Sequence, residues 1–407
     1  MKKILFVINT MGGAGAEKAL LEFLKRWNVP GYTVYLYVIM EQGEMIGQLP
    51  PQVHLLNSKF NKESVLSLAG RRKMIKRVIK AFWRNGNWFG KLHYIIKTFF
   101  TMIRTKRIQP DKLLWRMLSE GARRFDTRFD LAVAWLEGAS AYYVADHVKA
   151  DRKAALVHIN YEEAGYTREM DRDCWEKFDR IFAVSGETVE RFKSVYPEYK
   201  DKMDIFPNII DQEAIRNQAE LPGGFTDEYA GWRILTVGRL SWQKGYDIAI
   251  EAMKLLKEAD CRARWYVLGE GDQRSLLEKR ISALGLKEDF VLLGAVANPY
   301  PYFRQADIYV HAVRYEGQSI AVQEAQTLGC PIIVSNYSGS REAVGEEGAG
   351  MICELTPKAI ADSIIALLDD ENRRKELSQR AKGKKVPQGQ GVEKLLRMLE
   401  EEGRSIG

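Results

Sequence analysis

The sequence predicts an α/β protein made of two doubly wound domains, and three observations carry this prediction. At 407 residues, the chain is too long for a single hydrophobic core of ordinary size and suggests about two domains. An apolar strand opens each half, at Lys3–Thr10 and again at Arg233–Leu240, and each leads through a loop into a helix, Lys18–Trp27 and Tyr246–Glu258. Strands and helices then alternate through the second half. This order is typical of doubly wound units with parallel strands.

Composition narrows the class of protein. Apolar residues make up 46% of the chain and charged residues 28%, which are the values of a soluble globular protein. Met1–Thr10 is too short for a signal sequence, and no run of about 18 apolar residues could span a bilayer. We therefore expect a cytoplasmic protein with reduced thiols and no disulfide framework, because its four cysteines lie far apart and form no C-x-x-C pair: Cys174, Cys261, Cys330 and Cys353.

The turn after the first strand is rich in glycine. Gly12 and Gly13 lack side chains, so a ligand could approach the backbone closely there. A dinucleotide-binding G-x-G-x-x-G fingerprint would need a third glycine at the position of Lys18, so this signal for a nicotinamide dinucleotide is weak. A tight turn that binds nothing is the alternative interpretation.

Polar side chains end two later strands of the first half. The strand Asp130–Glu137 ends on Glu137, and Ala154–Asn160 contains His158 near its end. Residues just past the carboxyl ends of parallel strands point to the edge of the sheet where ligands bind. A lone histidine after an apolar run is more often structural, so both interpretations of His158 stay open. Further strands are predicted at Tyr32–Met40, Val53–Leu56 and Arg180–Ser185.

Positive charge is concentrated in one segment. The net charge of +7 conceals 18 Lys and Arg against 3 Asp and Glu in residues 59–125, a local +15, so the rest of the chain carries −8. Two amphipathic helices are predicted here, around Met74–Trp83 and Ile95–Ile103, with Gly86 and Gly90 breaking them.

Several partners fit such helices. They could bind an anionic membrane surface, to which each Lys or Arg contributes about 1 kcal/mol. Their apolar faces could instead pack on the sheet while the basic faces are solvated, or the charge could face an acidic, lipid-diphosphate acceptor. Nucleic acid is not expected, because no recognised nucleic-acid motif accompanies the charge.

Two cations follow the first strand of the second half. Arg239 and Lys244 lie five residues apart, on a loop that leads into the helix Tyr246–Glu258. Together they could clamp a diphosphate and neutralise the charge that develops on a leaving group. Two solvated loop cations are the alternative. Later strands are predicted within Trp265–Gly271 and at Phe290–Gly294.

Two glutamates lie eight residues apart in Ile308–Asn336, which has the pattern strand, loop, helix, strand. Glu316 falls on the loop past a strand's carboxyl end, where open α/β sheets bind ligands. Glu324 falls inside the helix that begins near Ser319, whose free N–H groups suit a phosphate. The pair could hold hydroxyls on either side of a diphosphate. One capping carboxylate and one solvated helix acid would give the same spacing.

These motifs resemble those of the retaining family-4 glycosyltransferases, the glycosyl transferases group 1. Glu316-Gly317-Gln318-Ser319, followed by Glu324-Ala325 and Gly329-Cys330-Pro331, is similar to the family's E-x7-E signature. The diphosphate loop of the family resembles Val237–Asp247, its crossing between domains resembles Asn208–Asp211, and its W-x-H-N stretch resembles the segment around His158. Many members carry an aromatic residue in place of Gln318 and glycine in place of Ser319, so the donor sugar stays open.

The resemblance implies the GT-B fold, in which two Rossmann-like domains face across a cleft. The expected parts are an acceptor-side domain at 1–215 with the basic helical insert 59–125, a nucleotide-sugar-binding domain at 216–390, and a helix at 391–407 that returns to the first domain. It also implies transfer of a sugar, with retention, from a UDP- or GDP-sugar to a hydroxyl of a glycan or lipid-linked acceptor. A bacterial cell-surface polysaccharide or glycolipid pathway is the implied setting, with the inner face of the membrane as a possible site of peripheral contact.

Roles for single residues are implied in the same way. Glu316 would contact donor sugar hydroxyls, Glu324 the ribose, Arg239 and Lys244 the diphosphate, and His158 would lie near the sugar and acceptor. Other donor contacts are expected at Gly12, Gly13, Val296, Gly317, Ser319 and Ile320. No metal ion or other cofactor is expected, since no D-x-D motif lies at a suitable strand end. The alternatives are a nucleotide-sugar epimerase of the same architecture, a nicotinamide oxidoreductase and a non-enzymatic membrane-surface binder.

Overall fold

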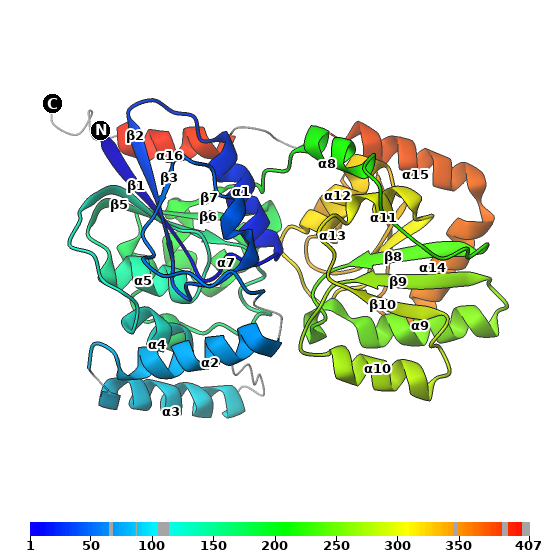
Figure 1. Cartoon of the computed structure of the whole chain (residues 1–407), viewed down its shortest axis with the longest axis horizontal. Helices are drawn as coiled ribbons and strands as arrows, with labels where there is room; N and C mark the ends of the chain where they lie inside the picture. The colour runs from blue at the N-terminus through cyan, green and yellow to red at the C-terminus, as the bar shows by residue number, and fades with distance from the viewer. Residues whose placement is uncertain (65–67, 87, 105–113, 346–347, 385–389, 401–407) are drawn as a thin grey trace. The chain divides into compact units, whose positions relative to one another are not determined.

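The computed structural model describes residues 1–64, 68–86, 88–104, 114–345, 348–384 and 390–400, and these form two compact units. The first unit comprises Met1–Ile209 and helix α16 (Gln390–Glu400), and the second begins at Ile210. Each unit is a parallel sheet flanked by helices (Figure 1). The prediction of two doubly wound domains is confirmed.

The sheet of the first unit has seven strands in the order β3-β2-β1-β4-β5-β6-β7. Strand β1 pairs with β2 on one side and β4 on the other, so the direction of winding reverses between β1 and β4. Apolar runs buried on both faces form the central strands, as a parallel sheet covered by helices requires. The strands are β1 (Lys2–Ile8), β2 (Tyr32–Val38), β3 (Val53–Leu55), β4 (Phe129–Ala134), β5 (Ala150–Val157), β6 (Arg180–Ala183) and β7 (Met203–Ile205).

Helices connect these strands. They are α1 (Gly15–Arg26), α2 (Leu68–Trp83), α3 (Trp88–Arg104), α4 (Trp115–Glu120), α5 (Ala139–His147), α6 (Arg168–Asp171) and α7 (Gly186–Val195), with short 3-10 turns η1 (Glu44–Gln48), η3 (Trp175–Lys177) and η4 (Pro197–Lys202). The C-terminal helix α16 belongs to the same unit, because Lys394 pairs with Asp204 at 2.8 Å and Lys2 Nζ donates to the carbonyl of Leu399 at 2.7 Å. Residues 401–407 of the expected C-terminal helix lie outside the described residues.

Helices α2 and α3 correspond to the basic segment, and one detail of the prediction is wrong. Gly90 does not break a helix, because α3 begins at Trp88 and continues through it. Lys91 is not solvated either. Its ammonium is buried and donates to the carbonyls of Ala81 (3.1 Å), Phe82 (3.0 Å) and Arg84 (2.6 Å) at the end of α2. Those carbonyls lack partners within their own helix, so a cation there satisfies them.

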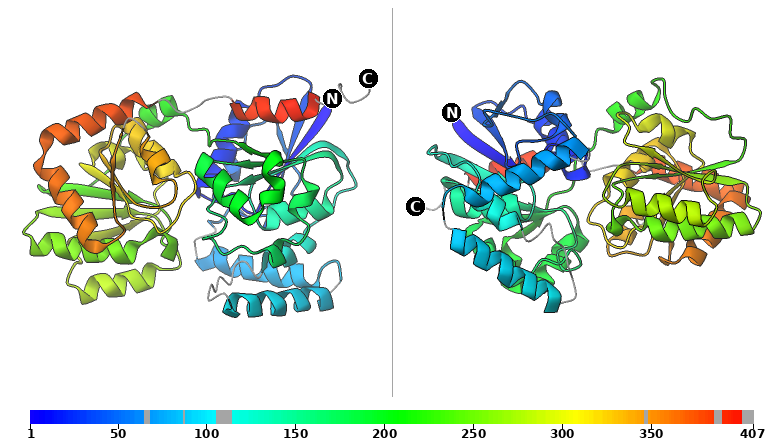
Figure 2. Two further views of the ribbon diagram at one scale, coloured as in Figure 1. Left: turned by 180° about the vertical axis from the view of Figure 1, so that it is seen from behind. Right: turned by 60° about the horizontal axis from the view of Figure 1, so that its bottom comes forward.

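The apolar faces of α2 and α3 are not packed on the sheet. Helix α4 packs against α5 and α2, α5 in turn packs against β4, and α3 is the outermost helix on this side of the unit in Figure 1 and in the left view of Figure 2. Large apolar side chains on both helices are therefore exposed, among them Phe89 at 85%, Phe100 at 65% and Trp83 at 60%. The interpretation in which these faces cover the sheet is wrong. Parts of the expected insert, residues 65–67, 87 and 105–113, lie outside the described residues.

The second unit contains a six-stranded sheet in the order β10-β9-β8-β11-β12-β13. Its strands are β8 (Trp232–Val237), β9 (Ala263–Leu268), β10 (Phe290–Gly294), β11 (Ile308–His311), β12 (Ile332–Ser335) and β13 (Met351–Cys353). Its helices are α8 (Gln212–Ala219), α9 (Tyr246–Glu258), α10 (Arg274–Ala283), α11 (Tyr300–Gln305), α12 (Ile320–Leu328), α13 (Ser340–Val344), α14 (Pro357–Asp369) and α15 (Glu371–Gly383), with the 3-10 turn η5 (Trp242–Lys244).

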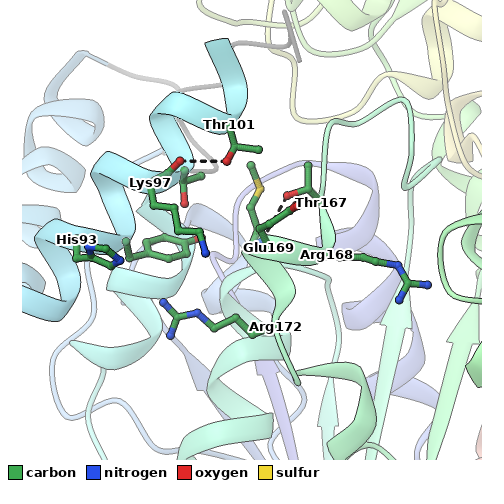
Figure 3. A pocket seen from close by; sticks show the side chains of 10 residues that line it. His93, Lys97, Thr101, Thr167, Arg168, Glu169 and Arg172 are labelled. Atoms are coloured by element: carbon green, nitrogen blue, oxygen red, sulfur yellow. Dashed lines mark hydrogen bonds between the residues drawn. The ribbon is translucent and has the colours of Figure 1, made fainter. Parts of the chain in front are cut away.

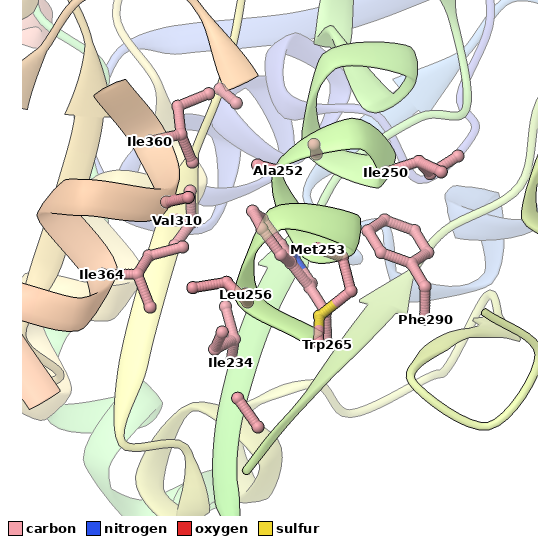
Figure 4. Packing of buried hydrophobic residues seen from close by; sticks show 14 of the residues in the cluster. Ile234, Ile250, Ala252, Met253, Leu256, Trp265, Phe290, Val310, Ile360 and Ile364 are labelled. Carbon is pink, nitrogen blue, oxygen red and sulfur yellow. The ribbon is translucent and has the colours of Figure 1, made fainter. Parts of the chain in front are cut away.

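A buried apolar cluster fixes the strand that leads to the candidate site. Trp265 of β9 packs among side chains of α9 and α14 on one face of the sheet (Figure 4). Its indole donates to the Thr236 hydroxyl at 2.9 Å, and this hydroxyl donates to the carbonyl of Val310 at 2.8 Å. The bonds hold β8, β9 and β11 together below their carboxyl ends. The labelled members of the cluster include Ile234, Ile250, Met253, Leu256, Phe290, Ile360 and Ile364.

The units divide at Ile209/Ile210, a few residues before the 215/216 boundary expected from the sequence. Helix α8 belongs to the second unit, where it packs against α11 and α12 and buries Ile215. No helix within the described ranges is both long and apolar enough to traverse a bilayer.

Candidate functional site

The candidate site lies where the winding of the second sheet reverses. Strand β8 pairs with β9 and with β11, so the loops after β8 and β11 leave neighbouring strands at the same edge of the sheet. Arg239 and Lys244 are on the first loop and Glu316 is on the second. Open α/β sheets bind ligands in the crevice at this reversal.

Lys244 and Glu316, which are far apart in the sequence, meet in this site. The ammonium of Lys244 donates to Glu316 Oε2 in a close ion pair, with 17% and 14% of the two side chains exposed. Burial on its own would raise the pKa of Glu316. The Lys244 charge and the His311 ring outweigh burial and lower that pKa to about 2. The carboxylate is therefore ionised at any physiological pH.

A histidine that the sequence did not single out lies behind this carboxylate. His311 is the last residue of β11 and is buried, with Nε2 3.7 Å from Glu316 Oε2 and Nδ1 3.3 Å from the Tyr309 hydroxyl. Burial lowers its pKa below the ordinary value, so the ring is neutral at neutral pH. A proton on Nε2 would point the ring's donor at Glu316 and leave Nδ1 to accept from Tyr309. The signal in the sequence that could have identified His311 is its place as a polar residue in an otherwise apolar strand.

Arg314 joins the two loops. Its guanidinium forms a two-point ion pair with Asp247 at 2.7 and 3.0 Å and lies 4.4 Å from the ring centroid of Trp242. Its backbone N–H donates to the carbonyl of Gln243 at 2.8 Å, and the Gln243 side chain donates to the carbonyl of Tyr315 at 2.8 Å. These bonds hold Lys244 beside Glu316.

Gly245 makes the close approach of the two loops possible. It has φ of +60°, and a Cβ atom at this position would lie 2.2 Å from the carbonyl oxygen of Ala312. Both its left-handed backbone and the lack of space exclude a side chain. Glycine at this position therefore lets the turn that carries Lys244 press against the residue after β11.

The other residues of the predicted signature lie just before α12 or within it. Ser319 is the N-cap and accepts a hydrogen bond from the N–H of Val322 at 3.4 Å, Ile320 is the first helical residue, and Gly317 precedes them on the loop. Glu324 is buried, and its Oε1 accepts a hydrogen bond from the Tyr300 hydroxyl of α11 at 3.1 Å.

Two predicted donor contacts stand apart from the ion pair. Arg239 lies on the same loop as Lys244, but its exposed guanidinium forms no hydrogen bond or ion pair with any described residue. Val296 lies after β10, a strand separated from β8 by β9, where it is half-buried against the apolar core.

A glutamate side chain accepts hydrogen bonds from the glycine turn of the first unit. Glu17 is buried, and its carboxylate accepts hydrogen bonds from the N–H groups of Gly12 (3.0 Å) and Ala14 (2.7 Å) and from the Thr10 hydroxyl. The N–H of Gly12 is therefore used within the turn, whereas Gly13 is exposed. Glu17 was not among the site residues predicted from the sequence.

His158 lies after β5 in the first unit. Its ring centroid is 6.0 Å from that of Trp135, its backbone N–H donates to Glu137 Oε2 at 2.9 Å, and its buried Nε2 has no partner among the described residues. Burial lowers its pKa to about 4. The ring is therefore neutral near pH 7, so one of its nitrogens can donate a hydrogen bond and the other can accept one.

Of the predicted residues, the structure brings Lys244 and Glu316 into contact and places Gly317, Ser319, Ile320 and Glu324 on the segment that follows. Gly12, Gly13 and His158 belong to the first unit, at two different strand ends. Across the described ranges, no three His, Cys, Asp or Glu side chains are grouped as a metal ion would require.

A known domain family and known proteins are similar to this chain. Residues 228–384 match the family model "Glycosyl transferases group 1". The N-acetylgalactosamine-N,N'-diacetylbacillosaminyl-diphospho-undecaprenol 4-alpha-N-acetylgalactosaminyltransferase of Campylobacter jejuni is 23% identical over 389 residues, which cover 94% of each chain.

Solved structures extend the likeness to the whole fold. A TarM variant of S. aureus in complex with fondaparinux, α-GlcNAc-glycerol and UDP gives a TM-score of 0.65 at 12% identity, covering 98% of this chain and 100% of that one. Anabaena HepE in complex with UDP gives 0.62 at 14% identity, covering 100% and 99%. Residues 228–384 of the second unit therefore form a glycosyl transferases group 1 domain, and the chain has the GT-B fold of solved glycosyltransferases.

Proposed function

We propose that the enzyme is a retaining family-4 glycosyltransferase that moves a sugar from a UDP- or GDP-sugar to a hydroxyl of a glycan or lipid-linked acceptor. The observation that carries the proposal is the Lys244–Glu316 pair at the reversal of the second sheet, directly before the amino terminus of α12. The UDP bound by TarM and HepE, and the diphospho-undecaprenol in the name of the Campylobacter relative, support the choice of donor and acceptor. Synthesis of a bacterial cell-surface polysaccharide or glycolipid is the setting.

Each charged residue has a separate task in this proposal. The Lys244 ammonium has three N–H groups, and its bond to Glu316 leaves two for the diphosphate. The guanidinium of Arg239 adds a planar fork that suits phosphate oxygens, and the N–H groups at the start of α12 add a positive dipole end. Glu316 is held ionised and accepts hydrogen bonds from hydroxyls of the donor sugar.

The reaction follows from these tasks. The bond between the anomeric carbon and the diphosphate oxygen breaks, and the negative charge passes to the diphosphate, where Arg239 and Lys244 stabilise it. The acceptor oxygen bonds to the oxocarbenium-like carbon on the same face, and its proton goes to a diphosphate oxygen. Neutral His158 is assigned to hydrogen bonding near the sugar and acceptor.

Donor binding is tested by replacing Glu324. A hydrogen bond to a charged group contributes about 1.5–3 kcal/mol, so Glu324→Ala should weaken nucleotide binding about 10- to 100-fold. Calorimetric titration with UDP, GDP and ADP, and with their sugars, measures this change and identifies the base. The matched control is Glu288→Ala, which removes an exposed acid from a loop of the same unit. A change below about twofold in Glu324→Ala would exclude the ribose role, and no binding of any of these nucleotides would reject the donor assignment.

We also propose that the exposed faces of α2 and α3 contact an anionic bilayer. Apolar side chains that face solvent on both helices are interspersed with Arg72, Lys73, Lys76 and Lys97, which complement acidic lipid headgroups. A membrane-surface helix of this kind buries its apolar stripe in the interface and keeps its cations at the headgroup level.

Vesicle binding tests this contact. Sedimentation with phosphatidylglycerol-containing vesicles should show binding that falls steeply between about 0.05 and 0.5 M salt. Phe89→Ser/Phe100→Ser should weaken binding about 10- to 100-fold, because each ring buries a large apolar surface. Leu276→Ser, an exposed apolar residue on α10, is the control and should change little. Salt-indifferent binding would contradict the electrostatic part, and unchanged binding of the double variant would contradict insertion of α3.

A further inference from the structure

The first unit contains a cavity of about 380 Å³ between α3 and the α6 segment (Figure 3), and one of its lining residues, Lys97, also belongs to the basic surface of α2 and α3 described above. Helix α3 supplies one wall and the start of α6 the other. Its lining residues are His93, Tyr94, Lys97, Thr98, Thr101, Thr167, Arg168, Glu169, Met170 and Arg172.

The cavity has a buried polar group without a partner. Tyr94 is 4% exposed, and its hydroxyl, although it lies near the Thr98 side chain, has no hydrogen-bond partner of good geometry among the described residues. A buried hydroxyl that lacks a partner destabilises the fold, and most such groups in folded proteins are satisfied. The Tyr94 hydroxyl could be satisfied by a ligand that brings an acceptor atom into the cavity.

Two cations at the rim have no acidic partner in the part of the chain that the structure describes. Lys97 and Arg172 come from opposite walls (Figure 3), and neither side chain forms a hydrogen bond or ion pair with a described residue. Arg172 lies only over the ring of Tyr94, 5.5 Å from its centroid. Arg168 is different, because Glu198 (2.7 and 2.9 Å) holds its guanidinium away from the cavity. The two unpaired cations outnumber Glu169, the one carboxylate in the lining.

The same helix presents an apolar stripe beside the cavity. Phe89, Ile96 and Phe100 are exposed and follow one another at helical spacing along α3. Lys97 is one residue on from Ile96, about 100° around the helix, and so lies between the stripe and the cavity wall. A molecule with an anionic head in the cavity could therefore lay an apolar chain along the stripe.

We propose that this cavity binds the phosphate group of an amphiphile whose apolar chain runs along the exposed stripe of α3. Lys97 and Arg172 hold the phosphate oxygens, and the Tyr94 hydroxyl donates to one of them. This inference rests on the proposed function in one respect, since a lipid-linked diphosphate acceptor and an anionic phospholipid both have this chemistry.

Titration of the full-length enzyme with matched probes tests the proposal. The probes are a short-chain prenyl diphosphate, a short-chain phosphatidylglycerol, inorganic diphosphate and the prenyl alcohol. The wild type should bind one of the two amphiphilic phosphates at least about tenfold more tightly than inorganic diphosphate or the alcohol, and the preferred one identifies the source of the phosphate. Lys97→Ala/Arg172→Ala should weaken that binding about 30- to 100-fold, and Tyr94→Phe about 3- to 10-fold.

The control is Lys3→Ala/Lys200→Ala, which removes the same charge from exposed positions of the same unit outside α2 and α3. Equal losses in the two double variants would overturn the proposal, because they would show diffuse attraction and not a site. Equal affinity for inorganic diphosphate and the amphiphiles would overturn it too. UDP binding is measured in every variant. If UDP binds but no amphiphilic phosphate does, this inference fails and the donor assignment survives; if UDP does not bind, the donor assignment fails independently.

Discussion

Glu316→Gln is expected to lower kcat about 100-fold while UDP affinity stays within about threefold of the wild type. Glutamine keeps the size of the side chain but loses the negative charge and one acceptor oxygen. If Glu316 holds hydroxyls of the donor sugar, the loss falls on the sugar as it becomes cationic and not on the nucleotide. The variant also releases Lys244 from its ion pair, so the diphosphate should be held at least as well as before.

Steady-state kinetics and UDP titration on the same preparation separate these effects. The matched control is Glu258→Gln at the end of α9, whose exposed carboxylate pairs, within the described part of the chain, with Lys254 alone at 3.5 Å. It should leave both quantities unchanged. Equal losses of turnover and UDP affinity in Glu316→Gln would contradict the sugar-positioning role.

Lys244→Met is expected to lower kcat/KM about 100- to 1000-fold and to weaken UDP binding about 10-fold. The ammonium is assigned to charge that develops on the leaving diphosphate, so its removal acts more strongly on the transition state than on the bound nucleotide. The variant also leaves Glu316 largely buried without its counter-ion, which destabilises the second unit by up to about 3–5 kcal/mol.

The pH dependence of stability distinguishes the ion pair from a packing defect. In the wild type the pKa of Glu316 is about 2, below the value of about 4.3 for an unfolded chain. This depressed pKa stabilises the fold above about pH 4.3, and the contribution is lost as the pH falls toward 2. In Lys244→Met, burial acts without the ammonium and raises the pKa of the carboxyl. The difference in Tm between wild type and variant should therefore be largest near neutral pH and narrow below about pH 4.

Thermal unfolding at neutral pH and near pH 3.5 measures this difference. Lys254→Met, an exposed lysine on α9, is the control and should show a small difference that does not change with pH. A pH-independent loss in Lys244→Met would mean that packing, and not the charge on Glu316, explains the destabilisation.

Much of the candidate site was predictable because its signals are local. A strand end, a loop and a helix start are encoded by neighbouring residues, so Glu316, Ser319 and Glu324 could be placed on their elements from the sequence pattern alone. The contacts that orient these side chains were not predictable in the same way. His311, Arg314 and Tyr300 act on partners from other segments, and no sequence spacing reports such a contact.

The basic segment shows the same division. Its helical periodicity and excess of charge predicted α2 and α3. These patterns did not indicate which side chains would be buried. Gly90 is inside a helix because tertiary packing outweighs a single weak helix former. Lys91 is buried because the carbonyls at the end of α2 offer it three acceptors.

The sequence by itself therefore determined the fold class, the order of most strands and helices though not β7 and β13, and the loops that carry the charged residues. These properties follow from hydrophobic periodicity and turn chemistry, which act over a few neighbouring residues. Only the tertiary structure decided that Lys244 pairs with Glu316, that α3 keeps an apolar stripe exposed and that Tyr94 is buried beside two cations that pair with no described acid. These outcomes depend on which segments, although distant in the sequence, pack against each other and exclude water. The packing of the whole unit determines those contacts.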